Sequence, residues 1–317
     1  RSHREMGSKI SSLVFQPPEV SYVNAKRHIL WLPVVGNDGN SASGERSSTP
    51  AFYIDRKEKV TIIFSHGNAE DIGMIFDSFT EFSKELGVNV LAYDYEGYGK
   101  AGGVSTERNC YDNIEAAYNF LIEKINTKPE NIVLYGRSLG SGPSCYLAQK
   151  LKEKKIDIGG LILQSPLLSV YRVAFNFRFT LPGDMFPNVD RIRNVNCPVF
   201  VIHGTRDEVV PFWNGENLFL AAPVHLRARP YWVEGAGHNN IEGFCRDGEE
   251  FYEQIREFLI QWVPSYRSAL NANSNIAARV SNIRDMDFNS NAIYDSLQAQ
   301  NSSNGMMDNT SRSNRGF

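Results

Sequence analysis

The sequence lacks any apolar stretch long enough to cross a membrane as a helix. Its longest apolar run, residues 29–35, is short and contains Pro33, whereas a spanning helix needs about 20 apolar residues. The first residues also lack the apolar region of a secretory signal peptide. We therefore expect neither a membrane-spanning protein nor a secreted one.

Cysteine is scarce, and its spacing does not suit cross-links. The four cysteines are scattered along the chain without a C-x-x-C pair: Cys110, Cys145, Cys197 and Cys245. A disulfide framework or a zinc site would need paired or repeated spacing. We expect buried thiols in a reducing compartment.

A basic excess and the common cofactor motifs are missing as well. Lys plus Arg number 33 against 36 for Asp plus Glu, a net charge of −3, and nucleic-acid-binding domains usually carry a basic surface. No H-E-x-x-H, P-loop or EF-hand loop occurs, and residues 97–99 lack the third glycine of a dinucleotide site. The sequence predicts no cofactor, no metal ion and no nucleic-acid partner.

What the chain does contain is an alternation of short β-branched runs and amphipathic segments. The runs lie at residues 60–64, 89–93, 131–135, 160–164, 198–202 and 229–233. The clearest amphipathic segment has apolar residues at spacings of three and four: Ile114, Ala117, Tyr118, Leu121, Ile122 and Ile125. Alternation of this kind predicts an α/β fold, with a mostly parallel central sheet flanked by helices. We expect the Gly/Ser/Asn-rich insert at 36–50 to form a hairpin loop.

A candidate nucleophile follows the third of these strands. Residues 136–140 read Gly-Arg-Ser-Leu-Gly and are followed by a helix-compatible segment. This is the G-x-S-x-G pattern in its strand–turn–helix context, where glycines relieve crowding around a strained serine. The alternative is an ordinary turn serine. We predict that Ser138 is a nucleophile.

A serine hydroxyl needs a base, and in this architecture the histidine follows the serine and the acid along the chain. His238 lies in a loop of small residues after the expected strand 229–233, at the carboxyl end where such sheets place ligands. We expect His225, ahead of that strand, to be a surface residue. The prediction is that His238 is the base.

The acid is expected between Ser138 and His238. Asp207 follows the expected strand 198–202, in the loop that should face the other two residues. Asp184 and Asp190 lie in a Pro- and Gly-containing excursion instead, and pairing of Asp207 with Arg206 in a simple turn is the alternative. We predict Asp207 as the acid and regard His203 as a structural hydrogen-bonding residue.

The oxyanion hole should combine the N–H after the nucleophile with one from the loop after the first central strand. These criteria select Leu139 and Asn68, with Gly67 allowing close approach of the backbone. A helix starting near Asp71 would add positive potential there.

The ends of the chain differ from its centre. Residues 6–11 match the M-G-x-x-x-[ST] pattern of N-myristoylation with Gly7 as the acceptor, so we interpret residues 1–5 as a tag remnant. Residues 266–317 are rich in Asn and Ser without apolar periodicity, which is typical of a flexible tail. We expect a 1–14 lipidation segment, a hydrolase domain at 15–265 and a tail at 266–317.

These motifs resemble the α/β-hydrolase superfamily, and specifically the α/β-hydrolase domain-containing protein 17 group of protein depalmitoylases, over residues 15–262. The resemblance is carried by residues 65–71, 93–99, 135–140, 165–167, 203–209 and 232–239, and by two segments specific to that group, Arg-Val-Ala-Phe at 172–175 and Phe-Pro-Asn-Val-Asp at 186–190. It implies the α/β-hydrolase fold, the same roles for Ser138, Asp207 and His238, and thioesterase activity on S-palmitoylated proteins at membranes.

The chain departs from the group at its N-terminal end. Family members usually carry a palmitoylated cysteine cluster there, and this chain has no cysteine before Cys110. A myristoyl group on Gly7 would replace that attachment. Because one lipid chain alone binds membranes only marginally, we expect a second apolar contact from residues that follow it: Ile10, Leu13, Val14 and Phe15. We expect a cytoplasmic enzyme, peripheral on the cytosolic face of a membrane if Gly7 is myristoylated.

A short cap excursion, residues 166–197, is expected between two strands. Its aromatic residues would either line an acyl-chain groove or pack the excursion onto the body: Phe175, Phe177, Phe179 and Phe186.

Three hypotheses for function follow. The first is a serine hydrolase that cleaves acyl-protein thioesters through an acyl-enzyme, with an S-acylated protein or an acyl-lipid as substrate. The second is a carboxylesterase, lysolipid lipase or serine peptidase that uses the same residues. The third is an inactive hydrolase fold that serves as a membrane scaffold, which the presence of nucleophile, acid, base and oxyanion loop disfavours.

Overall fold

The computed structural model describes residues 14–22, 29–35, 47–175, 183–244 and 249–272. The chain divides into a first unit, residues 1–269, and a second, residues 270–317. The architecture below is that of the first unit.

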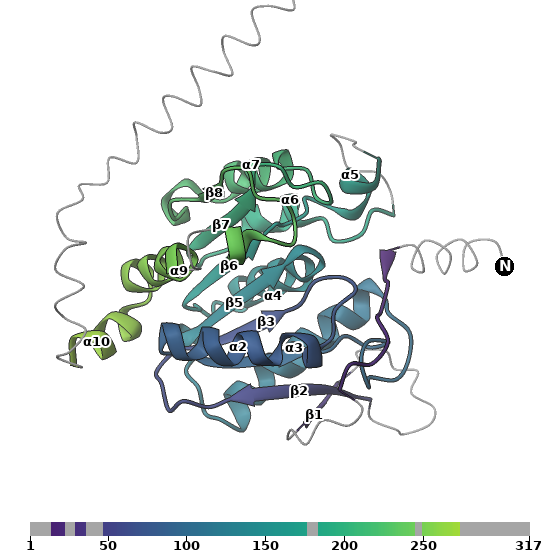
Figure 1. Ribbon diagram of the computed structural model, residues 1–317. Helices are drawn as coiled ribbons and strands as arrows, with labels where there is room; N and C mark the ends of the chain where they lie inside the picture. The colour runs from purple at the N-terminus through teal and green to yellow at the C-terminus, as the bar shows by residue number, and fades with distance from the viewer. Residues whose placement is uncertain (1–13, 23–28, 36–46, 176–182, 245–248, 273–317) are drawn as a thin grey trace, which may run out of the picture. The chain divides into compact units, whose positions relative to one another are not determined.

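One sheet of eight strands forms the centre of the described part of this unit, in the order β1-β2-β4-β3-β5-β6-β7-β8 (Figure 1). The strands are β1 (Leu30–Pro33), β2 (Ser48–Ile54), β3 (Thr61–Ser65), β4 (Asn89–Tyr93), β5 (Ile132–Arg137), β6 (Gly160–Gln164), β7 (Val199–Gly204) and β8 (Tyr231–Val233). β1 pairs with β2, and β2 with β4, in antiparallel fashion, and the remaining pairs are parallel. The expected mostly parallel α/β sheet is confirmed.

The β1–β2 hairpin was not predicted as strands. β1 alternates exposed and buried side chains at the edge of the sheet, so it gives a weaker apolar signal than the fully buried β3, β4 and β6. The expected loop 36–50 also extends too far, because β2 begins at Ser48, opposite Pro33.

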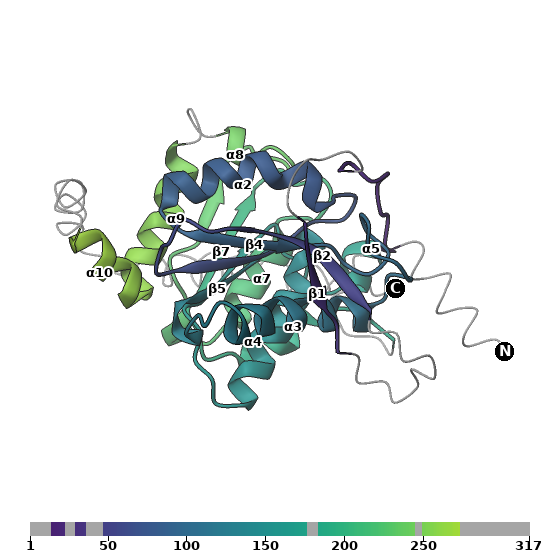
Figure 2. The ribbon, with the colours of Figure 1, turned by 90° about the horizontal axis from the view of Figure 1, so that it is seen from below.

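Helices cover both faces of the sheet. Their bounds are α2 (Ile72–Leu86), α3 (Glu107–Glu123), α4 (Ser141–Glu153), α5 (Val170–Phe175), α6 (Asn188–Arg191), α7 (Trp213–Ala221), α8 (Ile241–Phe244), α9 (Glu249–Trp262) and α10 (Pro264–Ala272), with short 3₁₀ turns η1 (Pro129–Asn131), η2 (Ser138–Gly140), η3 (Ile192–Asn194) and η4 (Val224–Leu226). α2 and α9 lie together on one side of the sheet, and α3 and α4 lie on the other (Figure 2).

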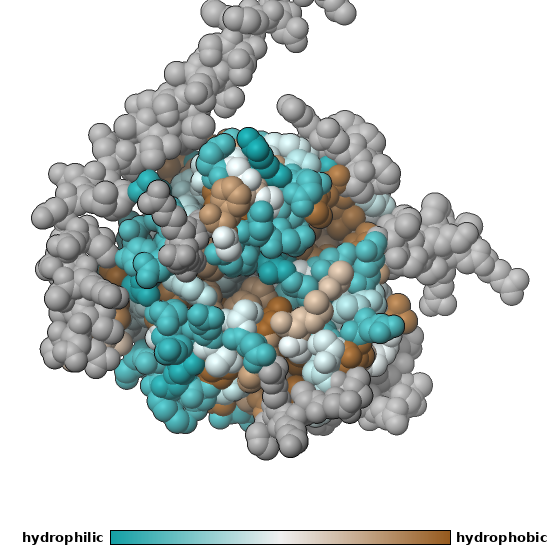
Figure 3. All heavy atoms as spheres, viewed as in Figure 1, coloured by the Kyte–Doolittle hydropathy of each residue, from teal (hydrophilic) through white to brown (hydrophobic). Residues whose placement is uncertain are grey.

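The ends of α2 are set by its sequence. The Asp71 carboxylate accepts the N–H groups of Gly73 and Met74, and Gly87 ends the helix with φ 64°, a conformation that glycine adopts without strain. The buried side of α2 includes Ile75, Phe79 and Phe82. Hydrophilic residues gather on the surface around the C-terminal half of α2 and around α9 (Figure 3).

The excursion between β6 and β7 carries α5, α6 and η3. Phe186 is fully buried in it, with its ring edge-on to Phe15 and Tyr111 and directly over Gly142 of α4. Of the two roles expected for Phe186, these contacts favour packing of the excursion onto the body over lining an acyl groove. Phe177 and Phe179, and the side chain of Phe175, lie outside what the structure describes.

A segment ahead of the first strand, residues 14–22, also belongs to the packed unit. Phe15 and Tyr22 are buried, at 5% and 3% exposure. The expectation that Phe15 contacts the membrane is therefore wrong, because its ring packs against Phe186. Phe15 belongs to the same apolar core as Leu134 of β5 and Ile114 of α3. Gly7 precedes this segment, outside the described residues.

The first unit ends at residue 269, a few residues beyond the predicted boundary at 265. Residues 266–272, which we expected to be tail, continue as α10, and the Tyr266 hydroxyl donates to the Leu86 carbonyl oxygen. The ring of Tyr266 is buried, and this burial compensates for ordering a polar sequence. None of the helices in the described ranges combines the length and apolar character needed to span a bilayer.

The burial of Phe15 leads to a prediction. Phe15→Ala should lower the free energy of unfolding by about 3 kcal/mol, since it leaves a cavity beside Phe186. Urea denaturation measures this, with Gln16→Ala as the control because the Gln16 side chain is exposed. Equal stability of Phe15→Ala and the unmodified protein would show that the segment is not part of the core.

Candidate active site

Ser138 sits in a strained turn between β5 and α4. Its φ is 51°, a left-handed conformation that is costly for a residue with a Cβ. A Cβ on Gly136 would lie 2.4 Å from the Gly140 carbonyl oxygen, and one on Gly140 would lie 2.0 Å from the Ser65 carbonyl oxygen. The two glycines of the motif are therefore required by close backbone approach, as the sequence predicted.

Two hydrogen bonds in series link Ser138 through His238 to Asp207, which lie in the loops after β8 and β7. His238 Nε2 lies 3.0 Å from Ser138 Oγ, and His238 Nδ1 lies 2.7 Å from Asp207 Oδ2. A carboxylate only accepts hydrogen bonds, so Nδ1 carries the proton and the lone pair on Nε2 faces the serine. The structure thus brings together the three residues that the sequence selected.

Both oxygens of the Asp207 carboxylate have hydrogen-bond or ion-pair partners. Oδ1 accepts the N–H groups of Val209 and Val210, at 2.9 and 2.8 Å, and Oδ2 lies 3.2 Å from His203 Nε2 as well as near His238. Burial on its own would raise the pKa of Asp207, but the hydrogen bonds from His203 and His238 outweigh it and lower the pKa below its usual range. Asp207 is therefore ionised at neutral pH.

The other candidates do not reach Ser138. His225 is exposed on η4, as predicted. His203 is buried and donates from Nε2 to the Val210 carbonyl oxygen, 2.9 Å away, which fits its expected structural role. In the excursion, Asp184 accepts the Tyr171 N–H and Asp190 is exposed.

The loop from His66 to Asp71, which we call the β3–α2 loop, faces the serine turn. Gly140 packs directly against the carbonyl oxygens of Ser65 and His66. Leu139 is buried just after Ser138, in the first turn of a helix, where backbone N–H groups have no partner within the helix. Asn68 lies in the turn of the loop, and its side chain bonds to the 14–22 segment.

An ion pair links this loop to the serine turn. Arg137, next to Ser138, pairs through Nη2 with Glu70 Oε1, and Glu70 Oε2 accepts the Gly67 N–H at 2.8 Å. Arg137 also lies 3.7 Å from Glu242, which accepts from Gln164 at 2.9 Å. Sequence reasoning missed Glu70 and Arg137, although Arg137 stands inside the G-x-S-x-G motif.

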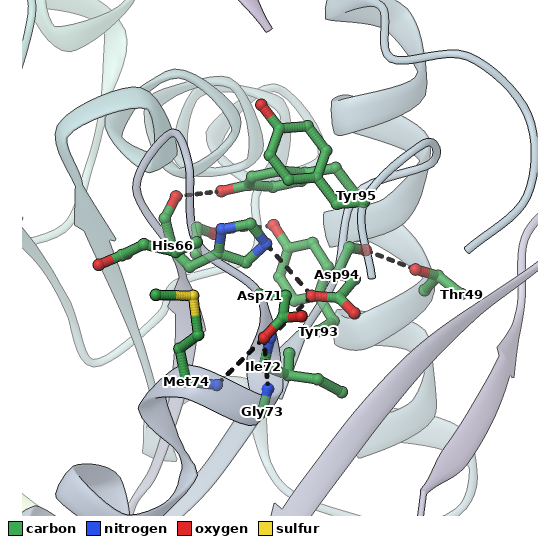
Figure 4. Close-up of polar contacts among 12 residues, drawn as sticks. Thr49, His66, Asp71, Ile72, Gly73, Met74, Tyr93, Asp94 and Tyr95 are labelled. Atoms are coloured by element: carbon green, nitrogen blue, oxygen red, sulfur yellow. Dashed lines mark hydrogen bonds and ion pairs between the residues drawn. The ribbon is translucent and has the colours of Figure 1, made fainter. Parts of the chain in front are cut away.

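A buried polar cluster lies beneath the loop (Figure 4). His66 Nε2 is 3.5 Å from Asp94 Oδ1, and the same oxygen accepts the Ile72 N–H. The Tyr95 hydroxyl donates to the His66 carbonyl oxygen at 2.6 Å. His66 is therefore a structural residue, and the Asp94 carboxylate holds the first N–H of α2.

The three cysteines in the described ranges take no part in this site. Cys110, Cys145 and Cys197 are buried free thiols, and burial raises the pKa of Cys145 and of Cys197 to about 12. Thiols of this kind are poor nucleophiles. The expectation of buried thiols holds for these three residues, and Cys245 lies outside the described ranges.

Curated proteins and solved structures resemble this chain. Human α/β-hydrolase domain-containing protein 17B is 40% identical over 224 residues, 70% of this chain and 73% of that protein. Protein 17C of Xenopus tropicalis is 39% identical over 208 residues, 65% of this chain and 64% of its own length, and human 17C is 39% identical over 60% of its length. The match thus spans about three fifths of the 17C relatives.

Solved structures share the fold at low identity. An esterase of Pyrococcus furiosus has a TM-score of 0.60 at 19% identity and covers 78% of this chain and 98% of its own. Est1E of Butyrivibrio proteoclasticus, solved with ferulic acid bound, has a TM-score of 0.56 at 18% identity, covering 74% of this chain and 99% of its own.

A family model described as "Serine aminopeptidase, S33" matches residues 56–189. This match begins ahead of β3 and runs into α6, so it includes the β3–α2 loop and the Ser138 turn. Together with the identity to protein 17B, it places the sequence within one group of serine hydrolases. The chain belongs to the α/β-hydrolase domain-containing protein 17 family of α/β-hydrolases.

Proposed function

We propose that this protein is an acyl-protein thioesterase that removes palmitoyl groups from cysteines through an acyl-enzyme on Ser138. The observation that carries the proposal is the hydrogen-bonded series from Ser138 through His238 to Asp207 in a chain of this family. The resemblance to the depalmitoylase group supplies the substrate class.

The geometry supports a two-step reaction. His238 Nε2 takes the Ser138 proton while Oγ bonds to the thioester carbonyl carbon, and the N–H groups of Leu139 and Asn68 stabilise the oxyanion. The intermediate then breaks its C–S bond, and His238 gives the proton to the departing cysteine sulfur. Water repeats the sequence on the acyl-enzyme, so that the products are a fatty acid and a free thiol. Asp207 stays ionised and stabilises the imidazolium.

Rates on a panel of acyl substrates test this function. A palmitoyl-cysteine peptide, the matching ester and an unmodified peptide should be cleaved in that order, because the thiolate is the better leaving group. Ser138→Ala should abolish turnover and also labelling by a fluorophosphonate, while keeping the fold. Faster cleavage of the ester would favour a carboxylesterase or lipase, and retained turnover in Ser138→Ala would exclude the proposed mechanism.

The lowered pKa of Asp207 predicts a pH-dependent contribution to stability. Because its pKa is depressed on folding, the carboxylate stabilises the fold above the unfolded value of about 4, and this contribution is lost as pH falls toward the folded pKa. Asp207→Asn should therefore be less stable by roughly 2 kcal/mol at pH 7, with the difference shrinking below about pH 4. Melting temperatures from pH 2 to 7 measure this, with exposed Asp190→Asn as the control. A difference that stays constant with pH would contradict the assignment.

We propose further that a myristoyl group on Gly7 holds the enzyme at the membrane. The chain from Gly7 to Val14 spans at most about 25 Å when extended, and the Val14 carbonyl oxygen accepts a hydrogen bond from Asn68 in the β3–α2 loop. A lipid at Gly7 would therefore keep that loop within about 25 Å of the bilayer.

Membrane attachment can be separated from chemistry with one substitution. In a chain that starts at Met6, Gly7→Ala should move the protein from membranes to the soluble fraction and leave hydrolysis of a soluble thioester unchanged. Fractionation and incorporation of tagged myristate measure the two effects, with Ser8→Ala as the control. Membrane binding by Gly7→Ala at the level of the unmodified chain would refute this role.

A further inference from the structure

The Asn68 side chain joins the β3–α2 loop to the 14–22 segment in both directions. Its Nδ2 donates to the Val14 carbonyl oxygen at 2.7 Å, and its Oδ1 accepts the Gln16 N–H at 3.0 Å. The Tyr98 hydroxyl donates to the same Oδ1 at 2.6 Å. An amide side chain is suited to this position because it offers a donor and an acceptor together.

The 14–22 segment is fixed independently of Asn68. Phe15 is buried against Phe186, which covers Gly142 near the start of α4. At the other end, Ser21 N donates to Asp71 Oδ2 at 2.7 Å and the Tyr22 hydroxyl donates to Asp94 at 2.5 Å. The segment therefore provides a rigid support beside the loop.

The carboxylates of Asp71 and Asp94 also fix the end of the β3–α2 loop that leads into α2. Asp71 caps α2 through the N–H groups of Gly73 and Met74, and Asp94 accepts the Ile72 N–H (Figure 4). Between this end and Gly67, which Glu70 holds, the backbone turns at Asn68 and Ala69. Ala69 has φ 55°, a conformation that costs free energy for a residue other than glycine.

We propose that Asn68 is a positioning residue for the hydrolytic reaction: its side chain, held by the 14–22 segment and Tyr98, fixes its own backbone N–H toward the oxyanion. The inference rests on the proposed function, which assigns that N–H to the oxyanion hole. Oxyanion donors act through their preorganisation, and losing one costs about 100- to 1000-fold in kcat. A donor that is present but mobile should cost less than a missing one.

The test compares Asn68→Ala with Asn89→Ala in the full chain. Asn89 is a matched control because it is buried and bridges backbone groups of residues 56, 58 and 60 at the start of β4, at the amino end of the strands. Both variants should lose thermal stability. Only Asn68→Ala should lose kcat on a soluble thioester, by about 10- to 100-fold with KM within twofold, and its rate of fluorophosphonate labelling should fall by a similar factor.

Smaller changes keep the test decisive if Asn68→Ala fails to fold. Tyr98→Phe removes one donor to Oδ1, and Asn68→Asp removes the donor to Val14. Each should lower kcat by a smaller factor than Asn68→Ala and leave KM unchanged.

The outcomes separate this inference from the proposed function. A kcat within twofold of the unmodified protein in Asn68→Ala, or in both milder variants if Asn68→Ala does not fold, overturns the positioning role. Equal losses in Asn68→Ala and Asn89→Ala overturn it too, since they would reflect general destabilisation. Retained turnover in Ser138→Ala overturns the proposed function instead.

Discussion

The left-handed backbone of Ser138 is the constraint on which the site depends. A φ of 51° at the end of β5 turns the serine away from the sheet and toward His238. Such a turn is possible only where residues 136 and 140 lack side chains, because Gly136 and Gly140 touch backbone oxygens. The strain is local, and the fully buried strands on either side of β5 hold it in place.

Contacts around the serine turn hold the β3–α2 loop next to it. The β3–α2 loop is joined to the turn by Glu70 and Arg137, to the 14–22 segment by Asn68 and to the sheet below by Asp94. These are contacts from three directions on a short stretch of backbone. Oxyanion stabilisation requires this kind of fixed geometry, because hydrogen-bond donors that must reorganise contribute less.

The sequence predicted the parts of the fold that carry strong local signals. Strands β3 to β8 are apolar and bounded by turn residues, and Asp207 and His238 lie in the loops that follow β7 and β8. The packing of the 14–22 segment was not predicted, because the burial of Phe15 and Tyr22 depends on Phe186 and Asp94, far away in sequence. The sequence left two roles open for Phe186, an acyl groove or packing onto the body, since it shows that a ring is apolar but not which surface the ring covers.

The central claim is that Ser138 carries the acyl group during turnover, and the most direct measurement is to locate that group. The protein should be mixed with a palmitoyl thioester, quenched within one turnover, digested and analysed by mass spectrometry. The account predicts palmitate on the peptide that contains Ser138, with no modification in Ser138→Ala. Palmitate on another residue during normal turnover would contradict it.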